Sequence, residues 1–436
     1  MADRFDAVAS SERGMCSRDR VIRHGGGLLL AAFLMLGCGT EDSAPEAEQS
    51  SPSAPSAAAT LPPTTAPTPT HTATPTHTAT SRPTVEATPV ATPVSSAVPE
   101  TEAPSQPLSD LAQTIDGVVE ELARSGEFSG SVLVAREGEV LLSKGYGFAD
   151  QAQKLPNGPE TRFRIASLTK QFTAMAILIL QTQGLVHVDD SICDYISDCP
   201  ATWQEITIHQ LLTHTAGVPD FTRFADYEAT KATPSSLQDT IDRFRDRALD
   251  FAPGSMWDYT NSGYILLGEI IEQASGQSYA SFVQEQIFGP LGMARSGYDD
   301  GLDRAVGYRR GATPADVIDM SIPHAAGGLV STVEDLYRWD QALYTEQLLP
   351  ATLSAEMFSP YATIPNSDGA AYGYGWVIEQ DGDRKLIGHN GGIEGFVGSI
   401  SRFPHARATV IFLSNQQSVN PRRMADLLMT PLLGAE

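Results

Sequence analysis

The stretch RIASLTKQFTAMAILIL, residues 164–180, constrains the fold more than any other part of the chain. In its last nine residues only Thr173 carries a polar side-chain group. A helix that is apolar on every side is buried on every side. The stretch therefore predicts a central, buried helix over about residues 167–183. Two polar residues, Ser167 and Lys170, stand at the head of this helix and call for an explanation.

Lys170 is unusual because this chain rarely uses lysine. The sequence has 29 lysines and arginines together, and only five of them are lysines. Arginine stays protonated in proteins, whereas a lysine that is buried can lose its proton. Lys170 is therefore a candidate acid–base group. The alternative is a long side chain whose ammonium group reaches water.

The chain is strongly acidic, with a formal net charge of −24 at pH 7. Nucleic acids and anionic membrane surfaces attract basic patches, so we expect no nucleic-acid partner and no electrostatic binding to lipid head groups. With 436 residues, of which 41% are hydrophobic, the chain is long enough to bury a sizeable core.

The N-terminus has the pattern of an export signal. Several arginines precede an apolar core at residues 28–36, which is too short to span a bilayer as a helix. The sequence LMLGC, residues 34–38, resembles a bacterial lipoprotein cleavage box, in which the cysteine receives the lipid. We therefore expect residues 1–37 to be a signal peptide and Cys38 to carry a lipid anchor in the membrane. The alternatives are an uncleaved anchor or plain secretion.

A low-complexity segment follows the export signal. Residues 41–106 contain 13 of the 29 prolines of the chain and no Phe, Trp or Tyr. Such a segment cannot bury a core. We predict that residues 38–106 hold the lipid-attachment cysteine and a disordered linker, and that residues 107–436 form the globular domain. This domain is expected outside the cytoplasm, anchored to the cell membrane or secreted.

Apolar periodicity sets the expected order of elements in the globular part. A helix and a hairpin come first, a long and mostly helical stretch follows, and four strands and a final helix over residues 421–433 close the chain. We expect an α/β fold of the α+β type. An antiparallel β-sheet flanked by helices would come from about residues 107–185 and 361–436, with a helical subdomain inserted at about residues 186–360.

Two local helix signals lie in the expected insert. The stretch ITIHQLLTHTAG, residues 206–217, has apolar residues at helical spacing. Farther along, Ser331 and Glu334 have the spacing of a capping box at the start of the helix STVEDLYRWDQALY.

The chain has four cysteines, and two of them fall in the globular part. Cys193 and Cys199 lie in one loop of an exported domain, where disulfides persist, so we expect a bridge between them. No second cysteine pair and no His-x-x-x-His pattern accompanies them. We therefore expect no metal site.

Ser167 and Lys170 are three residues apart and so share one face of the predicted helix. Lys170 would then reach the Ser167 hydroxyl. Free backbone N–H groups at the first turn would lie close to a nucleophile there and would stabilise a developing oxyanion. The Ser-x-x-Lys pattern alone is a weak signal, because about two matches arise by chance in a chain of this length.

Two further stretches carry polar groups suited to catalysis. DYTNSG contains Tyr259, whose phenol would pass a proton, and Asn261, whose amide would hold a substrate carbonyl. Its alternative interpretation is a turn with an N-cap asparagine. HNGG, residues 389–392, ends a predicted strand, where glycines allow a ligand or another backbone to come close. Its alternative interpretation is a hairpin turn.

Taken together, in this order, the three stretches resemble the motifs of the serine β-lactamases and penicillin-recognising peptidases. That motif set is Ser-x-x-Lys, a Ser/Tyr-x-Asn element and Lys-Thr-Gly. Tyrosine in the second motif indicates the branch with class C β-lactamases, D-alanyl-D-alanine carboxypeptidases and related esterases. The resemblance covers about residues 109–433, and the stretches LLTHTAGVP and HAAGGLVSTVEDLYRW are also similar to the family.

The resemblance implies a role for each matching residue. Ser167 would be the nucleophile that forms an acyl-enzyme, and Lys170 and Tyr259 would share its proton. The backbone N–H groups of Ser167 and Gly392 would form the oxyanion hole. The substrate would be bound by Asn261, His389, Asn390 and Gly391.

His389 departs from the family pattern, because it stands where the family usually has lysine, near the substrate carboxylate. This departure disfavours a β-lactamase and favours a peptidase or esterase. The resemblance implies a serine hydrolase without a cofactor, and we expect a monomeric, D-alanyl-D-alanine carboxypeptidase-like peptidase of the cell envelope. Its substrate would be a small molecule or a peptidoglycan peptide.

Other functions remain as alternatives at this point. One is an esterase or β-lactamase of the same fold. Another, from a different class, is a catalytically inactive lipoprotein that binds cell-wall peptide. An α/β-hydrolase is not indicated, because the sequence lacks a Gly-x-Ser-x-Gly elbow.

Overall fold

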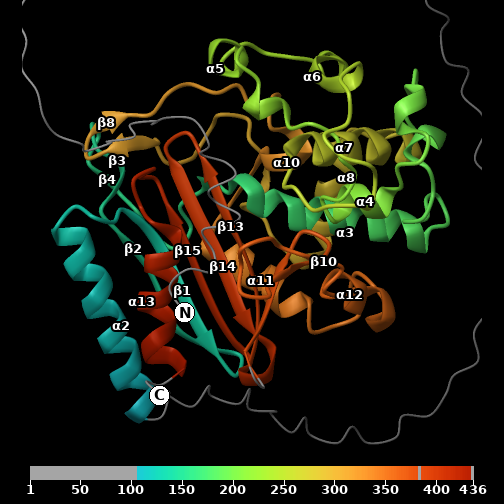
Figure 1. Cartoon of the computed structure of the whole chain (residues 1–436). Coiled ribbons are helices and arrows are strands. Elements are labelled where there is room, and N and C mark those ends of the chain that lie inside the picture. Colours follow the sequence, from blue (N-terminus) through green and yellow to red (C-terminus); the bar gives the residue numbers. More distant parts are fainter. Residues whose placement is uncertain (1–105, 382–383, 434–436) are drawn as a thin grey trace, which may run out of the picture. The chain divides into compact units, whose positions relative to one another are not determined.

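The computed structural model describes residues 106–381 and 384–433 (Figure 1). The predicted signal peptide, the lipid site at Cys38 and the linker lie outside the described residues, so they stay predictions. In the part of the chain that is described, no helix has both the length and the apolar character needed to cross a bilayer.

An antiparallel β-sheet lies at the centre of the globular part, and eight strands of the described residues form it (Figure 1). In spatial order the strands are β10 (Ala362–Thr363), β11 (Ala371–Tyr372), β12 (Val377–Asp381), β13 (Arg384–Ile393), β14 (Phe396–Phe403), β15 (Ala408–Ser414), β1 (Gly130–Arg136) and β2 (Glu139–Tyr146). Strands from the two ends of the globular part thus meet where β15 pairs with β1. The predicted fold class is confirmed.

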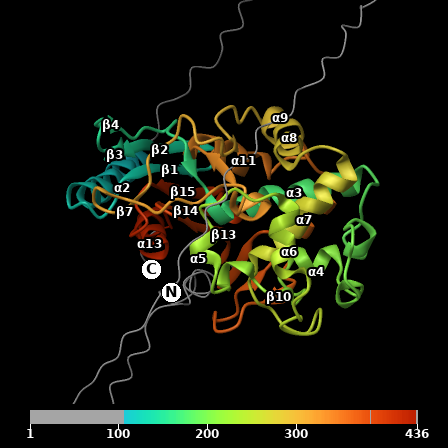
Figure 2. The ribbon, with the colours of Figure 1, turned by 90° about the horizontal axis from the view of Figure 1, so that it is seen from above.

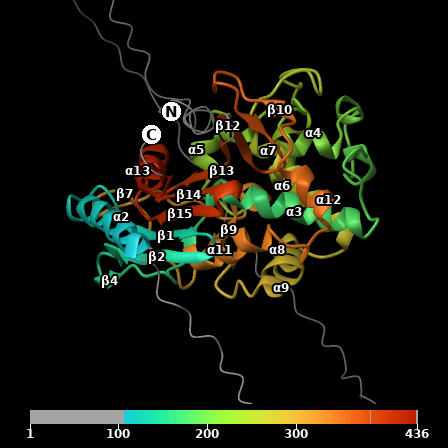
Figure 3. The same cartoon turned by 90° about the horizontal axis from the view of Figure 1, so that it is seen from below.

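The two faces of the sheet pack against different helices, because side chains alternate between the faces along a strand. In β15, Val410 and Phe412 join the core beneath α2 (Gln106–Arg124) and α13 (Pro421–Leu433). Ile411 and Leu413 join the larger core on the other face, which contains α3 (Thr169–Thr182). Figure 3 shows α2 beside α13 on their face of the sheet.

The helix α3 is buried as predicted. Its residues from Thr169 to Leu180 are all buried, and a 3-10 turn, η1 (Ala166–Leu168), leads into it. Four short or medium helices pack against α3 (Figure 1), and Figure 2 shows α7 beside it. These helices are α7 (Asn261–Ser275), α8 (Tyr279–Val283), α10 (His324–Gly327) and α12 (Ala351–Met357).

The stretch between α3 and β10 is mostly helical and carries short strands. Its other helices are α4 (Ile208–Leu212), α5 (Tyr227–Thr230), α6 (Leu237–Arg245), α9 (Gly289–Leu291) and α11 (Val333–Ala342). Its strands are β6 (Gly297–Tyr298), β7 (Tyr308–Arg310), β8 (Thr313–Pro314) and β9 (Leu329–Ser331). The strand β9 pairs with β6 and with β5 (Phe163–Arg164), which fixes the chain just before η1, while β3 (Phe148–Asp150) pairs with β4 (Leu155–Pro156).

Two local predictions in this stretch were wrong. The helix expected over residues 206–217 ends at Leu212, because the following residues turn and run beside another loop. The capping box of Ser331 and Glu334 does not form. Thr332 is the N-cap of α11, and its side chain accepts a hydrogen bond from the backbone N–H of Asp335 at 3.0 Å. Ser331 instead ends the strand β9 and is fully buried.

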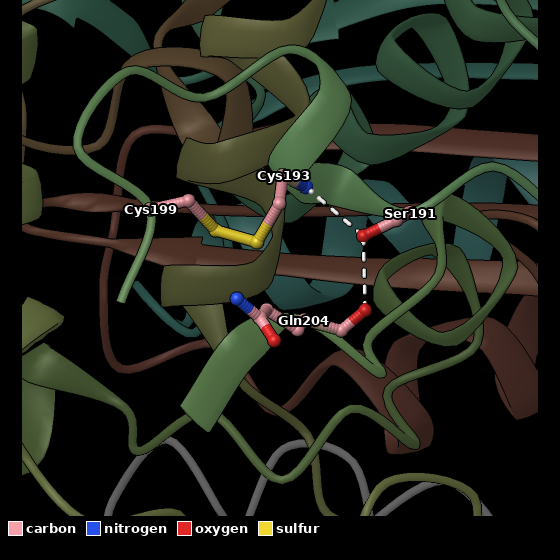
Figure 4. Close-up of a disulfide and its surroundings, with 4 residues drawn as sticks. All are labelled: Ser191, Cys193, Cys199 and Gln204. Atoms are coloured by element: carbon pink, nitrogen blue, oxygen red, sulfur yellow. Dashed lines mark hydrogen bonds between the residues drawn. A yellow bond between two sulfur atoms is a disulfide. The ribbon is translucent and has the colours of Figure 1, made fainter. Parts of the chain in front are cut away.

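A disulfide joins Cys193 and Cys199, six positions apart in the loop after α3 (Figure 4). The hydroxyl of Ser191 holds one side of this loop: it accepts a hydrogen bond from the backbone N–H of Cys193 at 3.3 Å and donates to the carbonyl of Gln204 at 3.0 Å. The disulfide therefore closes a small, already hydrogen-bonded loop.

Candidate active site

Ser167 and Lys170 meet at the head of α3. Ser167 lies in the turn η1, and the Nζ atom of Lys170 is 3.2 Å from its Oγ atom. Ser167 is 4% exposed and Lys170 is 0% exposed. The interpretation of Lys170 as a side chain that reaches water is therefore wrong.

Two more oxygen atoms surround the amino group of Lys170. Nζ lies 2.8 Å from Oδ1 of Asn261 and 2.9 Å from the carbonyl oxygen of Ala326 in α10. A neutral amine has two N–H donors and one lone pair, so it can donate to these two oxygens and accept the proton of the Ser167 hydroxyl. The arrangement therefore suits a base acting on Ser167.

The ring of Tyr259 lies close to the Lys170 amino group. Nζ is 4.7 Å from the centre of the Tyr259 ring, and the tyrosine is fully buried. Its ring also packs against His214, with the ring centres 4.4 Å apart. The structure therefore brings together the three residues predicted to transfer protons.

Asn261 is the first residue of α7 rather than its N-cap. Thr260 is the N-cap, so the interpretation of Asn261 as a capping residue is wrong. The amide of Asn261 is oriented from both ends: Oδ1 faces Lys170, and Nδ2 lies 3.4 Å from Oδ2 of Asp220 and 3.4 Å from Oγ1 of Thr222. Burial raises the pKa of the Asp220 carboxyl.

Residues 389–392 lie inside β13, not in a hairpin turn. The strand β12 pairs with β13 only at residues 384–388, so the rest of β13 has no partner among the described strands on that edge. A side chain at Gly391 would collide with the carbonyl oxygen of Ile165. Gly391 is therefore needed because the turn before Ser167 packs directly on the strand.

Ala166 adds a second sign of tight local geometry. Its φ of 48° lies in the left-handed region, which residues other than glycine rarely adopt. Strained backbone of this kind occurs where surrounding structure fixes a functional group. Here the fixed group is the hydroxyl of the next residue, Ser167.

His389 is a neutral, internal group. It is fully buried, its Nε2 atom lies 2.9 Å from the Tyr372 hydroxyl, and its Nδ1 atom lies 2.6 Å from the carbonyl oxygen of Asn390. Burial and, secondarily, the charge of Lys170 lower the pKa of His389 to about 3. His389 therefore supplies no positive charge near neutral pH, although the sequence placed it near a substrate carboxylate.

A cavity of about 390 Å³ opens beside the nucleophile. Its lining comes from η1, α7, the end of β13 and the loops of the helical insert. Of the predicted site residues, those that line it are Ser167, Asn261, Asn390, Gly391 and Gly392. Lys170, Tyr259 and His389 are not among the described lining residues, and they lie buried behind it.

The cavity also has lining residues that the motif analysis missed. Lys231, at the end of α5, forms an ion pair of 2.8 Å with Glu394, which follows β13. Lys231 also contacts Glu228 at 2.5 Å. The rarity of lysine in this chain was a signal that could have found Lys231. The family-like stretch HAAGGLVSTVEDLYRW contains Ala326, whereas no signal marked Glu394.

The described residues offer no grouping for a metal ion. In residues 106–381 and 384–433, no three His, Cys, Asp or Glu side chains come together in a way that could hold one.

A sequence profile of the Beta-lactamase family matches residues 111–430, which is most of the chain. The chain belongs to the beta-lactamase family. This beta-lactamase family member is a serine hydrolase with the beta-lactamase/transpeptidase fold.

Three named proteins are similar to this chain. Penicillin-binding protein 4* of Bacillus subtilis (strain 168) is 32% identical over 322 residues, which cover 68% of this chain and 70% of that protein. The octameric penicillin-binding protein homologue from Pyrococcus abyssi superposes with a TM-score of 0.66 at 30% identity, covering 75% of this chain and 78% of that one. D-amino acid amidase from Ochrobactrum anthropi SV3, complexed with D-phenylalanine, superposes with a TM-score of 0.64 at 27% identity, covering 74% and 99%.

Proposed function

We propose that this serine hydrolase is a peptidase of the cell envelope, similar to D-alanyl-D-alanine carboxypeptidases, and that it works through an acyl-enzyme on Ser167. The observation that carries the proposal is the position of the Lys170 amino group, 3.2 Å from the Ser167 hydroxyl and 2.8 Å from the Asn261 amide. One buried amine thus contacts the proposed nucleophile and the proposed substrate-binding amide.

The proposed reaction has two steps. In the first, Ser167 Oγ attacks the substrate carbonyl while its proton passes to Lys170, and the backbone N–H groups of Ser167 and Gly392 stabilise the oxyanion. The bond between the carbonyl carbon and the amine nitrogen then breaks, and the proton held by Lys170 passes by way of Tyr259 to the leaving amine. In the second step water attacks the ester carbonyl on Ser167 and gives a proton to the relay of Tyr259 and Lys170. The bond between the acyl carbon and Ser167 Oγ then breaks, the acid leaves, and the relay returns the proton to Oγ.

One comparison and one expectation from the sequence support a peptidase. The relative at 32% identity is named a penicillin-binding protein. The expected export signal and lipid site at Cys38 would place the enzyme at the cell envelope, and we propose that it acts there as a lipid-anchored monomer. The location at the cell envelope and the lipid anchor rest on the sequence alone.

A D-amino acid amidase is the second candidate, because His389 is neutral. A carboxypeptidase binds a terminal carboxylate, and the residue expected to face that carboxylate carries no charge and does not line the cavity. An amide substrate needs no such charge. The likeness to the D-amino acid amidase from Ochrobactrum anthropi SV3 supports this candidate.

Parallel assays of the exported protein decide between these functions. The substrates are a peptide ending in D-Ala-D-Ala, a D-amino acid amide, a chromogenic cephalosporin and a short nitrophenyl ester, and Ser167→Ala is the control. Release of D-alanine is the expected result. Faster release of ammonia from the amide would select the amidase instead.

Covalent labelling tests the acyl-enzyme itself. A fluorophosphonate should modify Ser167, and mass spectrometry of the digested protein locates the adduct. Failure to react with any substrate or with the fluorophosphonate would instead select the inactive binding protein considered at the outset.

A further inference from the structure

The segment LTHTAG, residues 212–217, has no part in the proposed reaction, although it resembles the family. The helix α4 ends at Leu212, the first residue of this segment, and the chain then runs alongside the loop that leads to Tyr259. The two segments are joined by backbone hydrogen bonds. The N–H of Asp250 donates to the carbonyl of Gly217 at 2.8 Å, and the N–H of Gly254 donates to the carbonyl of Thr215 at 2.8 Å.

His214 provides the last two contacts of this series. Its carbonyl accepts a hydrogen bond from the N–H of Asp258 at 3.1 Å. The next hydrogen bond between the two segments goes to its side chain: Nδ1 accepts a hydrogen bond from the N–H of Thr260 at 3.2 Å. Thr260 stands between the two residues of interest, Tyr259 and Asn261, so one ring nitrogen fixes the backbone that presents both.

The ring of His214 also holds the Tyr259 side chain. The ring centres of His214 and Tyr259 are 4.4 Å apart, and on another side the centre of the Tyr372 ring is 4.6 Å away. His214 is 0% exposed and has a φ of 59°, in the left-handed region. The side chain is thus enclosed, and the backbone that carries it adopts a conformation that is uncommon for residues other than glycine.

We propose that His214 is a positioning residue, which holds Tyr259 and Asn261 in the geometry needed for acyl transfer by accepting the Thr260 N–H and packing on Tyr259. The proposal rests on the proposed function, because it assigns no role to His214 outside the acylation of Ser167.

The unused nitrogen of His214 argues against a purely space-filling ring. In the described part of the chain, Nε2 is buried and has no hydrogen-bond partner. A buried donor without a partner destabilises a protein, and a phenylalanine would fill the same space without one. The advantage of histidine over phenylalanine at this position is therefore the hydrogen bond that Nδ1, its other ring nitrogen, accepts from the Thr260 N–H.

The ring must be neutral to play this role, because a proton on Nδ1 would remove the acceptor. Burial and the charge of Lys170 lower the pKa of His214. The other groups facing it, His389 and Arg223, act in the same direction, while the Thr260 hydrogen bond acts against them. The proposal accordingly requires the tautomer that carries its proton on Nε2.

The tautomer can be measured in the wild-type chain. Nitrogen-15 NMR of histidine-labelled protein, with the signal assigned by its loss in His214→Asn, reports which ring nitrogen carries the proton. We expect Nδ1 to be unprotonated at pH 7. A proton on Nδ1, in either a neutral or a charged ring, would overturn the proposal.

Two substitutions separate positioning from packing. His214→Phe keeps a flat ring and loses the acceptor, while His214→Asn tolerates the left-handed backbone and offers an amide oxygen in place of Nδ1. We expect His214→Phe to lower the rate of fluorophosphonate reaction with Ser167 about 100-fold, as misplacement of a catalytic group does. His214→Asn should stay within about tenfold of wild type, although it loses the ring.

The matched control is His209→Phe in the neighbouring helix α4. This change removes a side-chain hydrogen bond of 2.7 Å between His209 and Tyr374, and none with residues 259–261. It should leave the labelling rate within about threefold of wild type. Melting temperatures identify variants that are merely unstable.

The outcomes divide cleanly. A folded His214→Phe within threefold of wild type, or a folded His214→Asn as slow as His214→Phe, would overturn the proposal. If His214→Phe does not fold, the rate of His214→Asn and the NMR tautomer still decide. A wild-type protein that does not react with fluorophosphonate would count against the proposed function, whereas unaffected His214 variants of a reactive protein would count against the positioning role alone.

Discussion

Three oxygen atoms lie within 3.2 Å of the amino group of Lys170, and they limit the hydrogen bonds and proton transfers that this group can make. Two of these oxygens can only accept hydrogen bonds, and the third belongs to Ser167. A group that must receive the Ser167 proton has to lose its own proton first. Lysine can do so, and arginine cannot at any working pH.

Lys170→Arg should therefore abolish acylation although it keeps the charge. Loss of a positioned acid–base group costs about 10² to 10⁴ in rate. The measurement is the rate of fluorophosphonate labelling, with circular dichroism and thermal melting as controls for folding. Lys144→Arg is the matched substitution, because Lys144 sits in a half-exposed ion pair with Asp116 far along the sheet. A folded Lys170→Arg with more than about a tenth of the wild-type rate would show that Lys170 is not the base.

His389 makes the stability of the protein depend on pH. An imidazole ordinarily titrates near 6.5, whereas the folded protein lowers the pKa of His389 to about 3. Below pH 6.5 the unfolded chain binds a proton that the folded protein does not bind. Stability is therefore intact above pH 6.5 and falls as the pH drops toward 3.

Urea unfolding at pH 7 and pH 5 should reveal this dependence. His389 alone should lower the free energy of unfolding by about 2 kcal/mol between the two values. His389→Gln should remove that part of the loss, while His187→Gln, at an exposed position, should not. Equal pH slopes for wild type and His389→Gln would contradict the neutral, buried state of the histidine.

Sequence spacing was a good guide to some of these residues. Ser167 and Lys170 lie one helical turn apart, and a turn of chain brings a fixed pair together wherever the helix is placed. Asn261 and the HNGG stretch were found through their resemblance to a family. The carbonyl of Ala326 lies in the family-like stretch HAAGGLVSTVEDLYRW, but nothing in that stretch indicated its contact with Lys170, and Glu394 carries no sequence signal, because both contacts depend on packing between distant segments.

The close packing of the turn η1 on the strand β13 fixes the position of Ser167 in the site. Gly391 has no side chain, so the backbone at Ile165 lies directly on the strand. Gly391→Ala should destabilise the protein by about 1 to 3 kcal/mol, as overpacking does, and should slow acylation by displacing Ser167. Urea unfolding and fluorophosphonate labelling measure the two effects.

Gly117→Ala is the matched control for this substitution. Gly117 lies in α2, and nothing stands within 4 Å of a side chain added there. Alanine in a helix interior should raise stability by about 0.5 to 1 kcal/mol. If Gly391→Ala were as harmless as Gly117→Ala, the close packing of the turn on the strand would be wrong.

Element types followed well from apolar periodicity where one face or all faces of an element are buried. The helices α3 and α13 have this property, and their predicted positions agree with the structure. The prediction failed over residues 206–217, where apolar residues at helical spacing run into a segment held by hydrogen bonds to a distant loop. Tertiary contacts overrode local pattern there. The cap of α11 moved by one residue because Ser331 is occupied as the end of a strand.

The cavity is lined both by the sheet part of the domain and by the helical insert, and an ion pair between two lining residues links these two parts. Lys231 comes from the helical insert and Glu394 from the turn after β13, and their side chains are 8% and 14% exposed. A double-mutant cycle with Lys231→Met and Glu394→Gln should give a coupling of about 1 to 2 kcal/mol.

An exposed ion pair provides the comparison. Arg423 and Glu127 are 2.8 Å apart and also far apart in sequence, but their side chains are 64% and 48% exposed. Their coupling should stay below about 1 kcal/mol. A Lys231–Glu394 coupling no larger than this would mean that the buried ion pair stabilises the protein no more than an exposed one.

The pairing of β1 with β15 has a consequence for how the enzyme is made. Gly130 lies opposite Ser414, so the sheet cannot be completed until nearly the whole chain is present. Contacts between such distant residues form slowly, because the long intervening loop must close first. A chain exported from its N-terminus would present the apolar α3 segment outside the membrane before β13 to β15 arrive to cover it. The nascent enzyme is thus expected to depend on chaperones or to meet envelope proteases in that interval, and a chain cut short before β15 to be degraded rather than to persist as a weaker enzyme.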